Sequence, residues 1–419
     1  YFGWQRSAYG EQPPRALPVL AVMTGNIGLA GGGPGLIPTE PGIPIGFLPT
    51  GQNPVKAAIP TFKWTEAIER GVEFDFKHDG LKGVDKLSTN LKFIWNYAGN
   101  ALVNQHADCG RTAKLLRDTK KCEFIVTIDN FLTPSARFSD IVLPETTHFE
   151  REDIVSIYTF GGHAIYLNKV VEPMYECRNL YDICADIAGR LGFKEAFTEG
   201  KTQEQWVEEL CRQAEKLDPN FHFEEFKRTG IYKIDRKPVV AYADFIKDPD
   251  KNPLKTPSGK IEIFVKDFYD FGNPKEVPAI PKYISAWEGP EDPLREKYPL
   301  QCIGFHYKRR AHSTFDNIAW LDEAGPQVVW INPKDAQARG IKNGDQVKVF
   351  NDRGTIIMPA KVTPRIMPGV VAIPQGAWYS PDANGVDHRG CINVITTWRP
   401  TPLAKGNPQH TNLVEIHKA

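Results

Sequence analysis

Residues 304–317, GFHYKRRAHSTFDN, gather many side chains that can donate hydrogen bonds and contain a single acid. The stretch follows an apolar run, so we expect a loop that leaves the end of a strand. Arg310 presents five donors in a rigid planar fork, which suits a phosphate group or the edge of a planar heterocycle. His306, His312 and Ser313 are poor choices for solubility alone. We therefore interpret these four residues as binding residues.

Two later stretches carry similar side chains. Residues 374–396 place Trp378 close to a glycine and contain Asn393, and residues 403–412 contain Gln409 among other amide and hydroxyl groups. Each amide offers a donor beside an acceptor, which is what the edge of a heterocycle requires. Each loop by itself could be an ordinary turn between strands. Together, the three loops predict one wall of a cleft for a large, polar heterocyclic ligand.

Other charged side chains are interpreted as solvated. Lys308 and Arg309 belong to the first loop, but nothing in their spacing calls for a ligand. Four acids that follow a predicted strand match no set of metal ligands, so we expect a solvated loop there. These acids are Glu145, Glu150, Glu152 and Asp153.

The elements that would face these loops lie between residues 91 and 154. Apolar runs alternate there with helix-like segments, which predicts a parallel α/β unit of three strands. Ligands of such sheets bind beyond the carboxyl ends of the strands. After the first strand, backbone N–H groups of residues 97–105 can meet an anion. After the second strand, Asp129 can accept a hydrogen bond from a ribose hydroxyl or a base amine.

The rest of the chain supplies the frame. Residues 178–193 and 202–216 have the periodicity of amphipathic helices, and residues 259–268 have the alternation of one hairpin arm. Farther on, short strands and one small helix capped by Asn332 indicate a β-barrel. We therefore predict an α/β protein that ends in a barrel. Its expected parts are the tail of an upstream α/β domain with a Gly/Pro loop (1–60), an α/β nucleotide-binding domain (61–295) and the barrel (296–419).

Composition excludes several classes of protein. The 419 residues carry 51 basic and 51 acidic side chains, and this balance argues against a general binder of nucleic acid or of a membrane surface. No apolar run approaches the roughly 18 residues that a membrane span needs. The seven cysteines form no CxxC pair, and an odd number cannot complete a disulfide framework. The sequence begins without Met or a signal peptide, so we expect a fragment.

Four motifs together resemble those of a known family. The most specific is ARFSDIVLPETTHFERED, at residues 136–153. The set resembles the molybdopterin oxidoreductases of the dimethyl sulfoxide reductase family, and within it the catalytic subunits of the membrane-bound, anaerobic enzymes. The resemblance covers nearly the whole chain and is weakest over residues 196–295. The motifs occupy residues 3–33, 94–105, 127–153 and 403–412.

The resemblance implies a cofactor, bis(molybdopterin guanine dinucleotide) with molybdenum. It would lie between α/β domains and a C-terminal barrel of the double-psi type. Asn100, Asp129 and Thr133 would hold a guanine nucleotide. The pterin or its phosphate would contact the barrel loops and the first segment of the chain. The residues concerned are Gln5, Arg6, His306, Arg310, His312, Ser313, Trp378, Asn393 and Gln409.

The resemblance also implies parts that the sequence does not contain. The family's cysteine-rich motif for a [4Fe–4S] cluster is missing, as is the segment that supplies the protein ligand of molybdenum. We therefore expect about the C-terminal half of a catalytic subunit, which would not catalyse alone. Its substrate would be an S-oxide or N-oxide, and its partners an iron–sulfur subunit and a membrane-anchor subunit, with no nucleic acid. It would lie peripherally at the periplasmic face of the inner membrane, exported folded by the twin-arginine route.

Two alternatives stay open. The same cofactor could serve a selenate, thiosulfate or polysulfide reductase or a formate dehydrogenase, and the identity of the molybdenum ligand would separate these enzymes from an S-oxide reductase. The second alternative is a nucleotide-binding protein without a redox role. Such a protein would contain no molybdenum, no tungsten and no guanine nucleotide.

Overall fold

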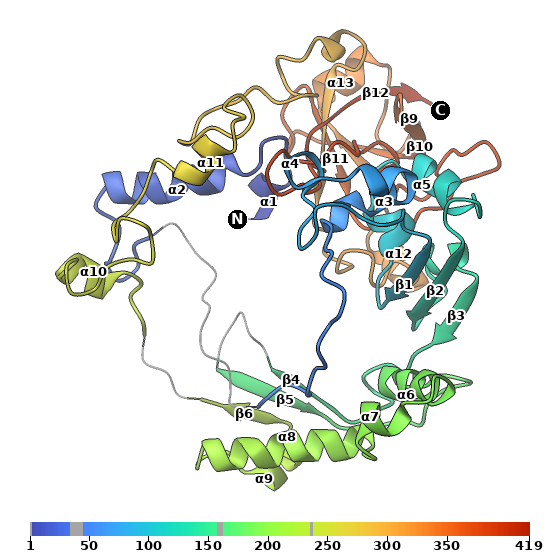
Figure 1. Cartoon of the computed structure of the whole chain (residues 1–419). Coiled ribbons are helices and arrows are strands. Elements are labelled where there is room, and N and C mark those ends of the chain that lie inside the picture. Colours follow the sequence, from blue (N-terminus) through green and yellow to red (C-terminus); the bar gives the residue numbers. More distant parts are fainter. Residues whose placement is uncertain (1, 34–44, 157–161, 235–237) are drawn as a thin grey trace.

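The computed structural model describes residues 2–33, 45–156, 162–234 and 238–419 (Figure 1). A β-barrel and a small parallel sheet lie beside each other at the upper right of the view. A lobe built from a second sheet and its helices lies apart from the barrel, at the bottom of the view. Within the described residues, no helix is both long enough and apolar enough to cross a membrane.

The predicted parallel α/β unit is confirmed. Strands β1 (Phe93–Tyr97), β2 (Phe124–Asp129) and β3 (Ile141–Pro144) pair in this order, and both pairings are parallel. All three carboxyl ends therefore lie at one edge of the sheet, where such units bind ligands. The connecting segments contain η3 (Ala101–Gln105), α5 (Cys109–Leu116) and η4 (Ala136–Phe138).

The predicted β-barrel at the C-terminus is also confirmed, and the structure shows that it is closed and has six strands. Its elements are β7 (Leu300–Phe305), α12 (Ala319–Ala324), β8 (Val329–Ile331), α13 (Pro333–Ala338), β9 (Gln346–Asn351), β10 (Gly354–Val362), β11 (Val370–Pro374), η6 (Ile392–Val394) and β12 (Asn412–Lys418). The strands follow the order β10-β8-β11-β7-β12-β9 around the barrel. β9 and β10 form an antiparallel hairpin, whereas β7 with β11 and β8 with β10 are parallel pairs. Asn332 caps α13 as predicted, because its side chain accepts a hydrogen bond from the N–H of Lys334.

The α/β unit and the barrel share one hydrophobic core. Leu102 and Val103 of η3 and Leu116 of α5 belong to the same buried cluster as the barrel residues. At the junction, the sulfur of Cys109 lies 3.8 Å from the sulfur of Cys391 in a barrel loop. All seven cysteines are free thiols. The common core fixes the carboxyl edge of the parallel sheet relative to the barrel loops.

The lobe is an antiparallel sheet covered by helices. Its elements are β4 (Asp153–Ser156), β5 (His163–Leu167), α6 (Leu180–Arg190), α7 (Lys194–Thr198), α8 (Gln203–Leu217), α9 (Phe223–Thr229) and β6 (Ile231–Lys233). α6 and α8 are the two predicted amphipathic helices. Thr202 begins α8 with a capping box, in which the side chains of Thr202 and Gln205 each accept a hydrogen bond from the other's backbone N–H. Leu210, Phe221 and Phe226 form part of a second core.

The remaining segments hold short helices. They are α1 (Phe2–Gln5), α2 (Gln12–Met23), η1 (Thr61–Lys63), α3 (Trp64–Arg70), η2 (Gly71–Glu73), α4 (Phe76–Asp79), α10 (Ala243–Lys247), α11 (Lys266–Asp270) and η5 (Pro293–Glu296). The hairpin arm predicted at residues 259–268 is wrong, because the alternating residues find no strand to pair with and the segment ends in α11. In the predicted Gly/Pro loop, residues 34–44 lie outside the described residues. Residues 45–60 form one isolated bridge, from Ala58 to Lys82.

Candidate functional site

The barrel topology delivers the three polar loops to one end of the barrel. β7 and β11 are parallel neighbours, so the loops that follow them emerge at the same end. β12 runs antiparallel to β7, so the loop that precedes β12 emerges there as well. Strand order therefore brings together the three segments that the sequence predicted to form one wall of a cleft.

The loops after β7 and β11 touch through His312. Its ring lies edge to face with the ring of His306, with centroids 5.0 Å apart, and its Nδ1 lies 2.9 Å from Nε2 of Gln375. His312 and Phe315 have φ values of 52° and 74°, which is strained backbone that persists only where the surroundings fix it. A Cβ on Gly376 would lie 1.7 Å from the carbonyl oxygen of His312. The two loops are thus in direct backbone contact.

The loop before β12 joins the same group and reaches the start of the chain. The backbone N–H of Gly304 donates to Nδ1 of His410 at 3.2 Å, and the N–H of His410 donates to the carbonyl of Arg6 at 2.7 Å. Gln409 lies close by, since a Cβ on Gly304 would be 3.7 Å from its Nε2. Gln5 and Arg6 are exposed at this point. The structure therefore gathers the predicted pterin-side residues of the first segment, the first loop and the last loop.

Arg310 faces the interior of the barrel end. Nη1 donates to Asp316 at 2.6 Å, Nη2 donates to Gln327 at 2.6 Å and to the carbonyl of Pro374, and Nε donates to the carbonyl of Gln375. Burial lowers the pKa of Arg310, although the charge of Asp316 opposes the change. Each guanidinium nitrogen is thus engaged within the protein. Arg310 joins the loops in this structure, and its contact with a ligand stays a prediction.

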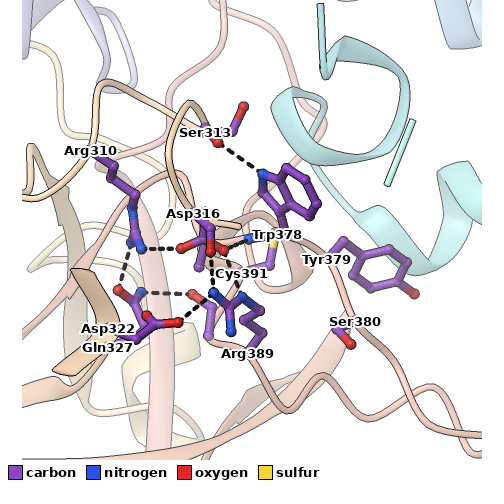
Figure 2. Close-up of polar contacts among 12 residues, drawn as sticks. Arg310, Ser313, Asp316, Asp322, Gln327, Trp378, Tyr379, Ser380, Arg389 and Cys391 are labelled. Carbon is purple, nitrogen blue, oxygen red and sulfur yellow. Dashed lines mark hydrogen bonds and ion pairs between the residues drawn. The ribbon is translucent and has the colours of Figure 1, made fainter. Parts of the chain in front are cut away.

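Asp316 is the centre of this network (Figure 2). Its carboxylate is fully buried and also accepts a hydrogen bond from the backbone N–H of Trp378 at 2.8 Å. Two of the surrounding guanidinium groups contact Asp322 of α12 as well. Sequence reasoning missed this role, although Asp316 is the single acid in an otherwise basic loop. The cations around it are Arg309 (3.1 Å), Arg310 (2.6 Å) and Arg389 (2.7 Å).

The interpretation of Arg309 as solvated is wrong. Only 5% of its side chain is exposed, because the loop folds back and places Asp316 and Asp322 beside its guanidinium group. Lys308, by contrast, is exposed as expected. Neighbouring cations in one loop thus take opposite environments.

Ser313 and Trp378 contact each other across the loops. The indole Nε1 of Trp378 donates to the backbone carbonyl of Ser313 at 2.8 Å (Figure 2). Ser313 therefore contributes its backbone carbonyl to this contact. Both residues are half-buried.

The π-helical turn η3 connects the barrel loops to the parallel sheet. Asn104 is buried, and its side chain donates to the carbonyl of Ala377 at 3.0 Å and accepts from the N–H of Tyr379 at 2.7 Å. Asn393 donates in turn to the carbonyls of Asn104 and Gln105. Such turns occur frequently at functional sites. Asn104 was not predicted, although it lies within the motif at residues 94–105.

The predicted nucleotide residues lie together at the carboxyl edge of the sheet. The side-chain oxygen of Asn100 accepts from the N–H and the hydroxyl of Ser135, at 3.1 and 2.8 Å. Thr133 begins the same turn and accepts from the N–H of Ala136. Burial raises the pKa of Asp129, while hydrogen bonds from backbone N–H groups and from the Thr133 hydroxyl act against this rise. The structure thus joins Asn100, Thr133 and Asp129 in one half-buried corner.

Two of the predicted residues carry buried polar atoms that lack a partner. Among the described residues, neither Nδ2 of Asn100 nor Oδ1 of Asn393 has a hydrogen-bond partner. Unpaired buried polar groups are costly, so native proteins rarely keep them without a ligand, a water or an ion. Asn100 lies just before η3 and Asn393 binds its end, so both atoms flank the same turn. A polar ligand at this turn fits the observation.

Glu145 and Glu150 are buried, so the expectation of a solvated loop is wrong for these two acids. Glu145 is buried and binds the hydroxyl of Tyr97 and the guanidinium of Arg151, both at 3.1 Å. Glu150 accepts hydrogen bonds from the N–H groups of Thr147 and Met174. Within the described part of the chain, no group of three or more His, Cys, Asp or Glu side chains could hold a metal ion.

Two hollows lie near the parallel sheet and the barrel loops. One of about 280 Å³ lies between η4 and the barrel loops and is lined by polar residues that include Arg137, Asp316 and Arg389. A larger one of about 360 Å³ lies between the end of β1 and the lobe, and its lining is mainly apolar, as at Trp206 and Leu210. Of the predicted site residues, Trp378 lines the first hollow and none lines the second.

Comparison with known families gives two matches. Residues 3–190 match the model described as molybdopterin oxidoreductase, and residues 300–413 match the model described as Molydopterin dinucleotide binding domain. The two matches contain all of the predicted cofactor-binding residues.

Curated relatives are similar over nearly the whole chain. The identity is 48% to dimethyl sulfoxide reductase DmsA of Haemophilus influenzae and 49% to DmsA of Escherichia coli, over 99% of this chain and 53% of each relative. It is 37% to the dimethyl sulfoxide/trimethylamine N-oxide reductase of Cereibacter sphaeroides, over 99% of this chain and 54% of that protein. The chain therefore spans about half the length of the curated relatives it matches.

A solved structure shares the fold. Acetylene hydratase from Pelobacter acetylenicus superposes with a TM-score of 0.64 at 21% identity, over 85% of this chain and 46% of that chain. At this identity, the likeness shows the fold alone. With the two family matches and the relatives at 48% and 49% identity, the chain belongs to the molybdopterin oxidoreductases.

Proposed function

We propose that this chain is the C-terminal part of the catalytic subunit of a molybdenum-dependent S-oxide and N-oxide reductase that works in anaerobic respiration. The observation that carries the proposal is the identity of 48% and 49%, over 99% of the chain, to two dimethyl sulfoxide reductases. Relatives at 34% to 37% identity include trimethylamine N-oxide in their names, which supports N-oxides as a second substrate class.

The proposed cofactor is bis(molybdopterin guanine dinucleotide) with molybdenum. We assign one guanine nucleotide to Asn100, Asp129 and Thr133. Guanine presents an acceptor, O6, beside two donors, N1–H and the N2 amine, so it complements an amide donor and a carboxylate acceptor. The unpaired Nδ2 of Asn100 and the half-buried carboxylate of Asp129 are such a pair.

We assign the pterin and its phosphate to the end of the barrel where the loops meet. Arg310 acts there by joining the loops, since its guanidinium nitrogens are engaged within the protein. Asn393 offers its unpaired Oδ1 beside η3. The residues that we expect to contact this part of the cofactor are Gln5, Arg6, His306, Arg310, His312, Ser313, Trp378, Asn393 and Gln409.

When bound, the cofactor supplies the two-electron chemistry by which an S-oxide or N-oxide, with two protons, gives a sulfide or amine and water. The residues of this chain bind and orient the cofactor. The α/β unit and the barrel share one hydrophobic core, which holds the proposed nucleotide residues at a fixed distance from the proposed pterin residues. Rigid placement matters, because small displacements of reacting groups cost large factors in rate.

We infer the remaining features of the intact protein from the same relatives and motifs. The barrel is of the double-psi type, which its two parallel strand pairs support. The domain boundaries lie near residues 60 and 295. The upstream half supplies a [4Fe–4S] cluster and the protein ligand of molybdenum. The subunit is peripheral, on the periplasmic face of the inner membrane, with an iron–sulfur subunit and a membrane-anchor subunit as partners.

The test uses the protein at its full natural length, expressed anaerobically with molybdate. We expect molybdenum in the purified protein, release of guanosine monophosphate by acid, and oxidation of a reduced viologen dye by dimethyl sulfoxide and by trimethylamine N-oxide. A protein without molybdenum, tungsten and guanine nucleotide would refute the proposal. Oxidation of formate, with no reduction of either oxide, would refute the substrate class alone.

A variant pair tests the nucleotide residues separately. Asp129→Asn should lower the content of guanine nucleotide about tenfold, because a carboxylate pairs with the two guanine donors more strongly than an amide does. Asp118→Asn is the control, because it changes a carboxylate of the same unit in the turn after α5. Equal nucleotide content in the two variants would remove Asp129 from the site.

A further inference from the structure

His410 has a defined tautomer. The backbone N–H of Gly304 donates to its Nδ1 at 3.2 Å. A backbone N–H can only donate, so Nδ1 must keep its lone pair, and the proton of the neutral ring is on Nε2. Within the described part of the chain, Nε2–H donates to no other residue. The contact with Gly304 thus leaves a donor of fixed position without a protein partner.

The surroundings of His410 keep the ring neutral. Burial is the main cause that lowers the pKa of His410 to about 4, and the charges of Arg6 and His306 act in the same direction. The backbone that carries the ring is also fixed, because the backbone N–H of His410 donates to the carbonyl of Arg6 at 2.7 Å. At neutral pH the side chain therefore offers one acceptor, already used, and one donor.

The free donor lies among the proposed pterin residues. His410 follows Gln409 directly, approaches His306 and is held by Arg6, and these are three of the residues assigned to the pterin and its phosphate. A pterin and its phosphate carry several oxygen acceptors, for which a neutral N–H is a suitable donor. Lysine or arginine at this place would bring a charge into a half-buried position next to Arg6.

We propose that His410 is a positioning residue that donates a hydrogen bond from Nε2 to an oxygen acceptor of the bound molybdopterin, an inference that rests on the proposed function. Gly304 selects the tautomer, and the tautomer supplies the donor. The barrel strand β7 is thereby linked to the cofactor through one imidazole ring. The hydrogen bond at one ring nitrogen of a histidine commonly determines whether the other nitrogen carries the proton.

Two substitutions separate the nitrogens of the ring. His410→Asn can place an amide oxygen near the position of Nδ1, which keeps an acceptor for Gly304 and removes the distal donor. His410→Gln can place an amide nitrogen near the position of Nε2, which keeps the distal donor and removes the acceptor. The protein is expressed at full natural length, and molybdenum, acid-released guanosine monophosphate and the thermal unfolding midpoint are measured for each variant.

We expect His410→Asn to unfold close to the wild-type temperature when both are free of cofactor, and to retain about tenfold less molybdenum and guanine nucleotide after dialysis. We expect His410→Gln to unfold at a lower temperature and to retain cofactor within about twofold of wild type. Retention by His410→Asn equal to wild type would overturn the proposal, and so would equal losses in both variants. Wild-type protein that contains no molybdenum and no guanine nucleotide would overturn the proposed function, and this inference with it.

Discussion

Asp316→Asn removes the one carboxylate around which three arginines meet. In the wild-type structure, two oxygens accept from Arg309, Arg310, Arg389 and the backbone N–H of Trp378. Asparagine keeps the shape of the side chain but has one acceptor oxygen, and its amide group would face donors. Asp322 remains as a partner for Arg309 and Arg389, at 2.6 and 2.8 Å. Arg310 loses the acid that it pairs with among the described residues.

The expected loss of stability is about 3 to 4 kcal/mol. Removal of one partner from a buried ion pair costs about 3 to 5 kcal/mol, because the other charge stays buried. Both Asp316 and the Arg310 side chain are fully buried, so solvent cannot replace the lost contact. The lower part of the range applies because two of the arginines keep Asp322. At about 2 to 4 °C per kcal/mol, the unfolding midpoint should fall by about 6 to 16 °C.

The assay is thermal and urea unfolding of wild type and variant under the same buffer conditions. Asp322→Asn is the matched control, because it removes the other acid of the network from a side chain that is 34% exposed. Partly exposed pairs contribute little, and we expect a loss below about 1.5 kcal/mol for the control. A loss below about 1 kcal/mol for Asp316→Asn would refute the view that this carboxylate holds the loops after β7 and β11 together.

Three further predictions concern other contacts of the site. The pKa of His410 is about 4 in the folded protein and 6.5 ordinarily, so the unfolded chain binds more protons between these values. Stability should therefore fall as pH drops from 6.5 toward 4, by up to about 1.4 kcal/mol per pH unit, and urea unfolding of His410→Asn should show a shallower dependence. An equal pH dependence of stability in wild type and His410→Asn would contradict the lowered pKa of His410. Gly376→Ala should lower the free energy of unfolding in urea by more than about 3 kcal/mol, because the added Cβ would meet the His312 carbonyl. The control Gly385→Ala, at a φ of 80° with open space around it, should lower it by about 1 kcal/mol. Similar losses in the two variants would rule out the clash. Asn104→Ala should lower the free energy of unfolding by about 2 to 4 kcal/mol, because the carbonyl of Ala377 and the N–H of Tyr379 would each lose a hydrogen-bond partner. The control Gln105→Ala, at the exposed neighbouring residue, should change it by less than about 0.5 kcal/mol.

Local elements could be predicted from the sequence where residues close together in the chain determine them. Asn332 predicted the start of the small helix α13, because its side chain accepts a hydrogen bond from an N–H of the first helical turn. The parallel unit was recognisable because buried strands and helices alternate over residues 91–154. The alternation at residues 259–268 wrongly predicted a hairpin arm. A strand forms only when another strand pairs with it, and the local sequence does not show whether such a partner is present.

The candidate site residues could also be chosen from the sequence. The polar residues of the three loops, the turn after β1 and the acid after β2 were chosen for their types and spacing. Their juxtaposition in the structure follows from strand order, since β7, β11 and β12 present their loops at one end of the barrel. Motifs with a specific pattern, above all residues 136–153, named the family from the sequence alone.

What each side chain does was decided by tertiary structure. Arg309 and Lys308 are adjacent in sequence, yet Arg309 is buried and Lys308 is exposed, because Asp316 and Asp322 pair with the guanidinium group of Arg309. Asn104 joins the α/β unit to residues more than 270 positions away. The sequence by itself determined which donors and acceptors are available and in which loops they lie. Only the packed barrel decided which of them are paired inside the protein and which, like Nε2 of His410, donate to no other described residue, because burial and pairing depend on groups brought together from distant parts of the chain.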